Sequence, residues 1–237
     1  MTRVYLCALS GFKCGSGKST VAGLLMNDPV FRRAWPACGL VDGASEFCGE
    51  STDQFLRAPS PAEPPESAEY LMLKQGFITG MWLGALRAEV ARLHAAFPEG
   101  PVLILTTRFM PRVNVSFCAK RGGEVCETAA EKLSDGLTPF LSDLFTRVYI
   151  FDFDDLYSDP LGTRVAFQRV QDRGRHAEAS LWALAENFHT FFNHSRRHTT
   201  PCPITTDVSW PNTPSLETLR SDPRAVCAHV AAVLTPQ

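Results

Sequence analysis

Short apolar runs alternate along the chain with longer segments in which apolar residues recur every three or four positions. Unbroken apolar runs are typical of strands covered on both faces, and the wider spacing is typical of helices that bury one side. Strands are predicted near residues 4–9, 39–41, 101–107, 147–151 and 203–206. Helices are predicted over residues 17–26, 68–96, 128–145, 163–173, 177–193 and 215–234. This alternation predicts an α/β fold: a five-stranded parallel sheet flanked by helices on both faces.

The composition favours one globular domain. The chain has 237 residues, of which 45% are hydrophobic and 20% are charged. That length is ordinary for one α/β domain, and that balance differs from the balance of disordered or fibrous proteins. We therefore predict a single domain over residues 1–237. The proline-rich stretch at residues 57–66 is predicted to be a surface loop within it, because proline fixes φ and removes a hydrogen-bond donor.

Net charge, apolar-run length and cysteine spacing argue against a nucleic-acid polymer as partner, a membrane span and a zinc site. The formal net charge of −2 provides no overall positive field for a nucleic-acid polymer. The amino-terminal residues lack the pattern of a signal peptide, and no apolar run approaches the roughly 18 residues of a membrane span. The eight cysteines lack the spacing of a zinc site, so we expect most of them to be small buried residues in a reducing compartment. A cytoplasmic protein is the prediction.

A phosphate-binding motif lies between the first predicted strand and the first predicted helix. Its glycines allow backbone N–H groups to turn toward phosphate oxygens, Lys18 can reach the outer phosphates, and Ser19 can offer a hydroxyl to Mg²⁺. One position departs from the usual motif, since Phe12 stands where a glycine is common. The residues predicted to bind ATP here are Gly15, Ser16, Gly17, Lys18, Ser19 and Thr20.

A cluster of arginines follows at the end of the helix predicted over residues 163–173. The guanidinium groups of Arg169, Arg173 and Arg175 could close over a transferring phosphoryl group and spread its developing charge. A solvated charged face is the alternative interpretation.

With Glu178, these arginines match the lid pattern of the deoxynucleoside kinase family, which the chain resembles over about residues 3–234. That family includes deoxycytidine and deoxyguanosine kinases and is related to viral thymidine kinases. The resemblance implies a P-loop kinase with a lid at about residues 169–178. It also implies that the lid arginines bind ATP phosphates, that Glu178 contacts the sugar 3′-hydroxyl, and that the protein is a homodimer.

The resemblance places a carboxylate at the end of the second strand, where Asp42 occupies the position of a family glutamate. It implies that Asp42 accepts the proton of the 5′-hydroxyl and that Phe47 packs near the base. A carboxylate suits a hydroxyl that becomes acidic only as it attacks phosphorus. Because aspartate is one methylene shorter than glutamate, Glu46 remains an alternative base, and Asp42 could instead be a turn residue at a strand end.

Two further matches concern the acceptor. Gln75, in the long helix, corresponds to a family glutamine whose amide reads the base through paired hydrogen bonds. Arg108 corresponds to an arginine that contacts the 5′ region of the nucleoside. The family's adjacent acid, which helps to hold Mg²⁺, is replaced by Thr107. The ion would then depend on Ser19, nucleotide oxygens and water, with Asp42 as a further candidate.

These residues together predict ATP- and Mg²⁺-dependent phosphorylation of a deoxynucleoside by direct in-line transfer, with Lys18, Asp42 and Arg108 as the catalytic residues. The resemblance, which is nearest to enzymes that favour pyrimidines and to viral thymidine kinases, implies thymidine or deoxycytidine as the acceptor, in nucleotide salvage. Residues 205–210 fall where the family's adenine-contacting loop lies. One alternative is a nucleoside monophosphate kinase, in which Arg108 and Arg112 would face the acceptor's phosphate. The other is a non-catalytic nucleotide-binding protein, which Phe12 and the missing acid would suit.

Overall fold

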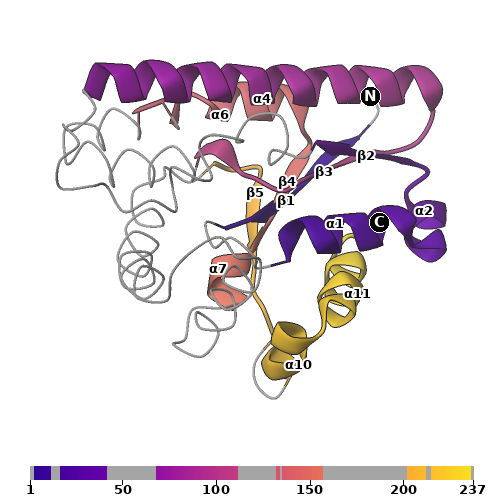
Figure 1. The fold of residues 1–237 in the computed structure, drawn as a ribbon. Coiled ribbons are helices and arrows are strands. Elements are labelled where there is room, and N and C mark those ends of the chain that lie inside the picture. Colours follow the sequence, from indigo (N-terminus) through magenta and orange to yellow (C-terminus); the bar gives the residue numbers. More distant parts are fainter. Residues whose placement is uncertain are drawn as a thin grey trace, which may run out of the picture.

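A five-stranded sheet forms the centre of the molecule, and each strand runs parallel to the strands beside it (Figure 1). The computed structural model describes residues 3–11, 17–41, 68–111, 132–133, 135–156, 202–211 and 215–235. The strands are β1 (Val4–Ser10), β2 (Ala37–Val41), β3 (Val102–Thr106), β4 (Arg147–Asp152) and β5 (Thr205–Val208). Their order across the sheet is β2-β3-β1-β4-β5. The predicted parallel sheet is therefore confirmed.

Helices cover both faces of this sheet. Helices α4 (Ala68–Ala96) and α6 (Thr138–Leu144) lie on one face, whereas α1 (Lys18–Asn27) and α11 (Pro223–Val233) lie on the other (Figure 1). Three shorter helices, α2 (Pro29–Ala34), α7 (Phe153–Leu156) and α10 (Ser215–Ser221), add side chains to the second layer. Successive strand residues point to opposite faces, so Leu6 packs toward α4 and Cys7 packs toward α1. The predicted α/β layering is confirmed.

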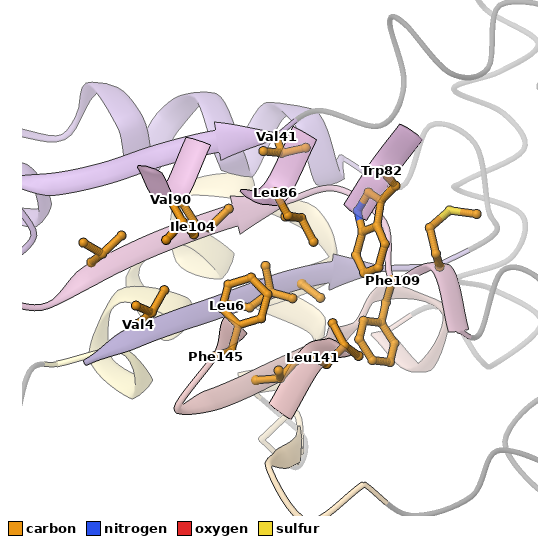
Figure 2. Close-up of a cluster of buried hydrophobic side chains, with 14 of the residues drawn as sticks. Val4, Leu6, Val41, Trp82, Leu86, Val90, Ile104, Phe109, Leu141 and Phe145 are labelled. Atoms are coloured by element: carbon orange, nitrogen blue, oxygen red, sulfur yellow. The ribbon is translucent and has the colours of Figure 1, made fainter. Parts of the chain in front are cut away.

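Helix α4 is anchored to the sheet by one stripe of buried side chains. Trp82, Leu86, Val90 and Leu93 are each 5% exposed or less and recur at helical spacing, and Figure 2 shows the first three. Full burial of a large apolar side chain contributes about 1.5–3 kcal/mol, so this stripe fixes the helix firmly. A Cβ added at Gly39 would collide with the side chain of Glu89, so α4 passes close to this point of β2.

The ends of the helices follow local capping signals. Asp222 accepts a hydrogen bond from the backbone N–H of Arg224 at 2.8 Å, and Pro223 occupies the first turn of α11. The single helix predicted over residues 215–234 is therefore wrong, because a cap and a proline divide it into α10 and α11. Asp28 caps the unpredicted helix α2 in the same way, with Val30 N–H at 2.7 Å. The helices predicted over residues 163–173 and 177–193 lie outside the described residues.

The cysteines that the structure describes are buried and free: Cys7, Cys38, Cys202 and Cys227. Burial raises the pKa of Cys38 to about 12, although the nearby Arg32 lowers it in part. Burial also raises the pKa of Cys7 and of Cys227. These three thiols stay protonated near neutral pH and act as small core side chains, as predicted. Within the described ranges, no helix is both long and apolar enough to cross a membrane.

An imidazole lies in the layer between the sheet and α11. The ring of His229 packs edge-to-face against Phe151 at 6.3 Å, and it lies at a tilt of 37° against the indole of Trp210 at 5.4 Å. Its Nε2 atom is buried without a hydrogen-bond partner. Burial lowers the pKa of His229 from its ordinary value of 6.5, while a hydrogen bond with the backbone of Ser209 acts in the opposite direction. The neutral imidazole is therefore the form that the fold favours.

We predict that His229 makes the fold sensitive to mild acid. Because the pKa is lower in the folded state, the unfolded chain binds more protons as the pH falls through 6.5, and the free energy of unfolding decreases. In His229→Phe this part of the pH dependence should disappear. Denaturant titrations above and below pH 6.5 measure it, and an equal loss of stability in both proteins would contradict the assignment.

Candidate functional site

The carboxyl ends of the central strands form the candidate site. The chain that leaves β1 returns to the sheet as β2, toward one edge, whereas the chain that leaves β4 returns as β5, at the other edge. Where neighbouring strands send their connections in opposite directions, a parallel α/β sheet opens a crevice that can hold a ligand. Ser10 and Asp152 pair in register at this point. The strand order therefore predicts that a ligand would bind at the carboxyl ends of β1 and β4.

The turn into α1 presents backbone donors at this end of the sheet. Gly17 has φ of 88° and ψ of 7°, a left-handed conformation that costs other residues about 1–2 kcal/mol. Its carbonyl accepts from Val21 N–H at 2.8 Å, and no side chain caps the helix. The first-turn N–H groups of Lys18, Ser19 and Thr20 are thus not used by a capping side chain, which suits an anion.

The predicted nucleotide residues at the start of α1 differ in exposure. Ser19 and Thr20 are exposed, and Lys18 is half-buried. No group of three or more His, Cys, Asp and Glu side chains that could hold a metal occurs in the described part of the chain. A magnesium ion that accompanies a nucleotide takes most of its ligands from phosphate and water, so a single exposed hydroxyl at Ser19 fits that donor set.

Arg108 stands out from the turn that follows β3. Thr106, Thr107, Phe109 and Met110 are all buried to 4% exposure or less, whereas Arg108 is half-buried. The Thr106 hydroxyl donates to the backbone carbonyl of Arg108 at 3.1 Å. Four buried neighbours therefore hold one basic residue at the carboxyl end of β3, beside β1.

Asp152 is a site residue that the sequence reasoning missed. It is 4% exposed at the end of β4, and alternation along the strands places it on the α4 side of the sheet together with Ser10 and Thr106. Its backbone carbonyl accepts from the indole N–H of Trp210 at 2.6 Å. The signal was a carboxylate directly after an apolar strand, but the predicted strand ended one residue earlier. Asp152 is the only charged side chain among the buried residues of the described ranges.

The segment predicted to contact adenine packs against the core at its end. Residues Thr205–Val208 form β5, and the ring of Trp210 lies edge-to-face on Phe153 at 5.5 Å. The indole N–H is committed to Asp152. Trp210 therefore ties the end of β5 to the end of β4, a role that the sequence did not indicate.

Helix α4 carries Gln75 past the sheet. Trp82 contacts Thr106, the last residue of β3, so the helical residues before Trp82 extend beyond the carboxyl end of that strand (Figure 1). Gln75 precedes Trp82 by about two turns, or about 10 Å at 1.5 Å per residue. Its backbone thus lies beyond the carboxyl ends of the strands, the end of the sheet at which Lys18 and Arg108 also lie.

The remaining predicted residues lie outside the described ranges, and their contributions stay predictions. Val41, which precedes Asp42, pairs in register with Thr106. The residues concerned are Gly15, Ser16, Asp42, Glu46, Phe47, Arg112, Arg169, Arg173, Arg175 and Glu178.

Comparisons with known proteins give matches at the level of structure. No protein-family model and no curated protein sequence matches the chain. It is similar to the structure of deoxyadenosine kinase from M. mycoides with bound dATP, with 12% identity, a TM-score of 0.45, and coverage of 93% of this chain and 98% of that chain. It is also similar to polyphosphate kinase 2 from Arthrobacter aurescens TC1, with 11% identity, a TM-score of 0.47, and coverage of 100% and 72% respectively.

Gly17, which precedes α1, and Gly23, within α1, provide a matched test of the turn. We expect Gly17→Ala to destabilise the protein by about 1–2 kcal/mol, because alanine disfavours positive φ. It should also weaken ATP binding. Gly23 lies within the helix with no atom near an added Cβ, so Gly23→Ala should stabilise by about 0.5–1 kcal/mol and leave ATP binding unchanged. Denaturant titration and calorimetry with ATP measure both effects, and equal behaviour of the two variants would refute the assignment.

Proposed function

We propose that this protein transfers the γ-phosphoryl group of ATP to the 5′-hydroxyl of a deoxynucleoside, with thymidine and deoxycytidine as favoured acceptors. The observation that carries the proposal is the left-handed turn at Gly17, which leads from the central strand into an uncapped helix that begins with Lys18 and Ser19. A half-buried arginine at the end of the neighbouring strand supports it. The product would be a deoxynucleoside monophosphate formed in nucleotide salvage.

Binding of ATP is assigned to the turn and to the arginines of the lid. Backbone N–H groups from Gly15 to Thr20 and the ammonium of Lys18 would bind the outer phosphates. Mg²⁺, held in part by the hydroxyl of Ser19, would neutralise charge on the phosphate oxygens. We assign Arg169, Arg173 and Arg175 to the same phosphates, where guanidinium groups would stabilise charge that develops during transfer.

The transfer itself needs a base and no covalent enzyme intermediate. The 5′-oxygen forms a bond to the γ-phosphorus while the bond to the bridging oxygen of ADP breaks. The proton of the 5′-hydroxyl passes to the carboxylate of Asp42, with Glu46 as the alternative acceptor. Val41, the residue before Asp42, ends β2 at the level of Thr106, so the chain leaves the sheet beside the turn of Arg108.

Recognition of the acceptor is assigned to residues around the part of α4 that precedes Trp82 and extends beyond the carboxyl end of β3. Arg108 would contact the 5′ region, Gln75 the base edge, Phe47 the base face and Glu178 the 3′-hydroxyl. The position of the α4 backbone beyond the carboxyl end of β3 supports the assignment of Gln75. The half-buried state of Arg108 equally suits an acceptor that carries a phosphate, which keeps a nucleoside monophosphate kinase as the second candidate.

A substrate panel tests the proposal. With Mg²⁺ and γ-labelled ATP, we expect phosphorylation of thymidine or deoxycytidine to exceed that of thymidine monophosphate. Asp42→Asn should lower kcat by about a hundredfold or more while ATP affinity is kept, and Glu46→Gln should have little effect. The reverse result for this pair would make Glu46 the base. Turnover of the monophosphate alone would favour the second candidate, and ATP binding without any turnover would favour a non-catalytic nucleotide-binding protein.

We also propose that the protein is a cytoplasmic homodimer. The buried, protonated thiols suit a reducing compartment. An exposed apolar row on α4 supports a second copy as partner: Leu73 is 75% exposed, Phe77 69% and Met81 40%. Gly76, Gly80 and Gly84 run beside this row, with open space where a Cβ would stand. A ridge beside a groove on one helix is a surface that can pack against its own copy.

Sedimentation equilibrium tests the homodimer. We expect Phe77→Asp to shift the protein toward the monomer, because a charge would be buried in the contact. Val30→Asp is the control, since Val30 is 66% exposed on α2, and it should leave the mass unchanged. A monomeric wild-type protein would contradict the proposal.

A further inference from the structure

The hydroxyl of Thr106 makes three hydrogen bonds at the carboxyl end of β3. It donates to the carbonyl oxygen of Arg108 at 3.1 Å, and it accepts from Arg108 N–H at 3.5 Å and from Trp82 Nε1–H at 3.4 Å. A hydroxyl offers one proton and two lone pairs, so these contacts occupy it fully. Thr106 is completely buried, at 0% exposure. The side chain thus joins three elements: the end of β3, the turn at Arg108 and helix α4.

Trp82 also contacts the residue that follows Arg108 in this turn. Its indole lies edge-to-face on the ring of Phe109, with centroids 6.4 Å apart and an interplanar angle of 82° (Figure 2). Trp82 is 1% exposed and Phe109 is 4% exposed, so both rings are fixed by packing. The indole therefore contacts residues on both sides of Arg108 in the chain.

These contacts fix the backbone of the turn that carries the charged side chain of Arg108. Thr107 and Met110 are each 2% exposed, which leaves Arg108 as the half-buried residue of this turn, at the carboxyl end of β3. An error of about 1 Å in the position of a reacting group can cost a hundredfold in rate. A buried hydrogen-bonded anchor is one way to avoid such an error.

We propose that the Thr106 hydroxyl, held by Trp82, is the positioning group that sets Arg108 against the reacting end of the acceptor. The inference rests on the proposed function, because it needs Arg108 to act there. Trp82 would then have a second role. Because the same indole joins α4 to the end of β3, it also sets the distance between the backbone of Gln75 and the turn of Arg108.

Two substitutions at one position separate the hydroxyl from the volume of the side chain. Thr106→Val keeps the shape and removes the hydroxyl, whereas Thr106→Ser keeps the hydroxyl. We expect Thr106→Val to lower kcat for the nucleoside by about tenfold to a hundredfold with the KM for ATP unchanged, and Thr106→Ser to stay within about threefold of the wild type. Equal rates for the two variants would overturn the proposal.

A double-mutant cycle with Arg108→Ala distinguishes positioning from a general structural defect. If Thr106 acts through Arg108, Thr106→Val should add little to the loss caused by Arg108→Ala. A defect spread over the whole fold would instead multiply the two losses, and that result would overturn the proposal.

Hydrogen exchange supplies a readout that does not depend on turnover. The peptide over residues 106–111 should exchange faster in Thr106→Val and Trp82→Phe than in the wild type, and at the wild-type rate in Thr106→Ser. Unchanged exchange in Thr106→Val would overturn the anchoring role even in an active enzyme. If the wild-type protein phosphorylates no nucleoside, the proposed function fails, whereas faster exchange would still establish that Thr106 holds the turn.

Discussion

The structure depends on a sheet whose central strand, β1, is paired on both sides and covered on both faces. Leu6, Cys7, Ala8 and Leu9 are completely buried, so no polar chemistry can occur along the length of the strand. Polar side chains are confined to the carboxyl ends, where the strands leave the apolar layers. Ser10, Thr106 and Asp152 lie there on one face of three adjacent strands. Burial of the sheet thus determines where polar side chains can bind a ligand.

Polar groups at the end of a buried strand need partners, and two indoles provide them. Trp82 donates to the Thr106 side chain, and Trp210 donates to the Asp152 backbone. An indole combines a large apolar surface with a single donor, so it can pack in the core and satisfy an acceptor at its boundary. The two tryptophans approach from opposite layers, one with α4 and one with the α11 side. The carboxyl ends of β3 and β4, at the candidate site, are therefore each bonded to an indole, one from either face of the sheet.

The sequence predicted the parts of the fold that have strong periodicity. The long helix over residues 68–96 and the strand near residues 101–107 were found because many apolar positions agree. Helix α2 was missed since six residues carry too little periodicity, although Asp28 and Pro29 gave a start signal. The break at Pro223 was overlooked because the apolar pattern continues through it.

The candidate site was predictable where a local motif exists and not where contact depends on the fold. Lys18 and Ser19 could be assigned because the glycine turn is continuous in sequence with them. The contact between Trp82 and Thr106 joins residues 24 apart, and the contact between Trp210 and Asp152 joins residues 58 apart. Such pairs have no sequence signature, because they arise only when helices settle on a particular strand.

The length of α4 has a mechanical consequence. Its packed part, from Ile78 to Leu93, covers about 22 Å at 1.5 Å per residue, while the turns from Ala68 to Ile78 extend for about 15 Å. The part of the helix that packs on the sheet is therefore longer than the part that precedes it. Gln75 lies three residues before Ile78, so the packing of Ile78, Leu86 and Val90 on the sheet sets the position of its backbone from a distance.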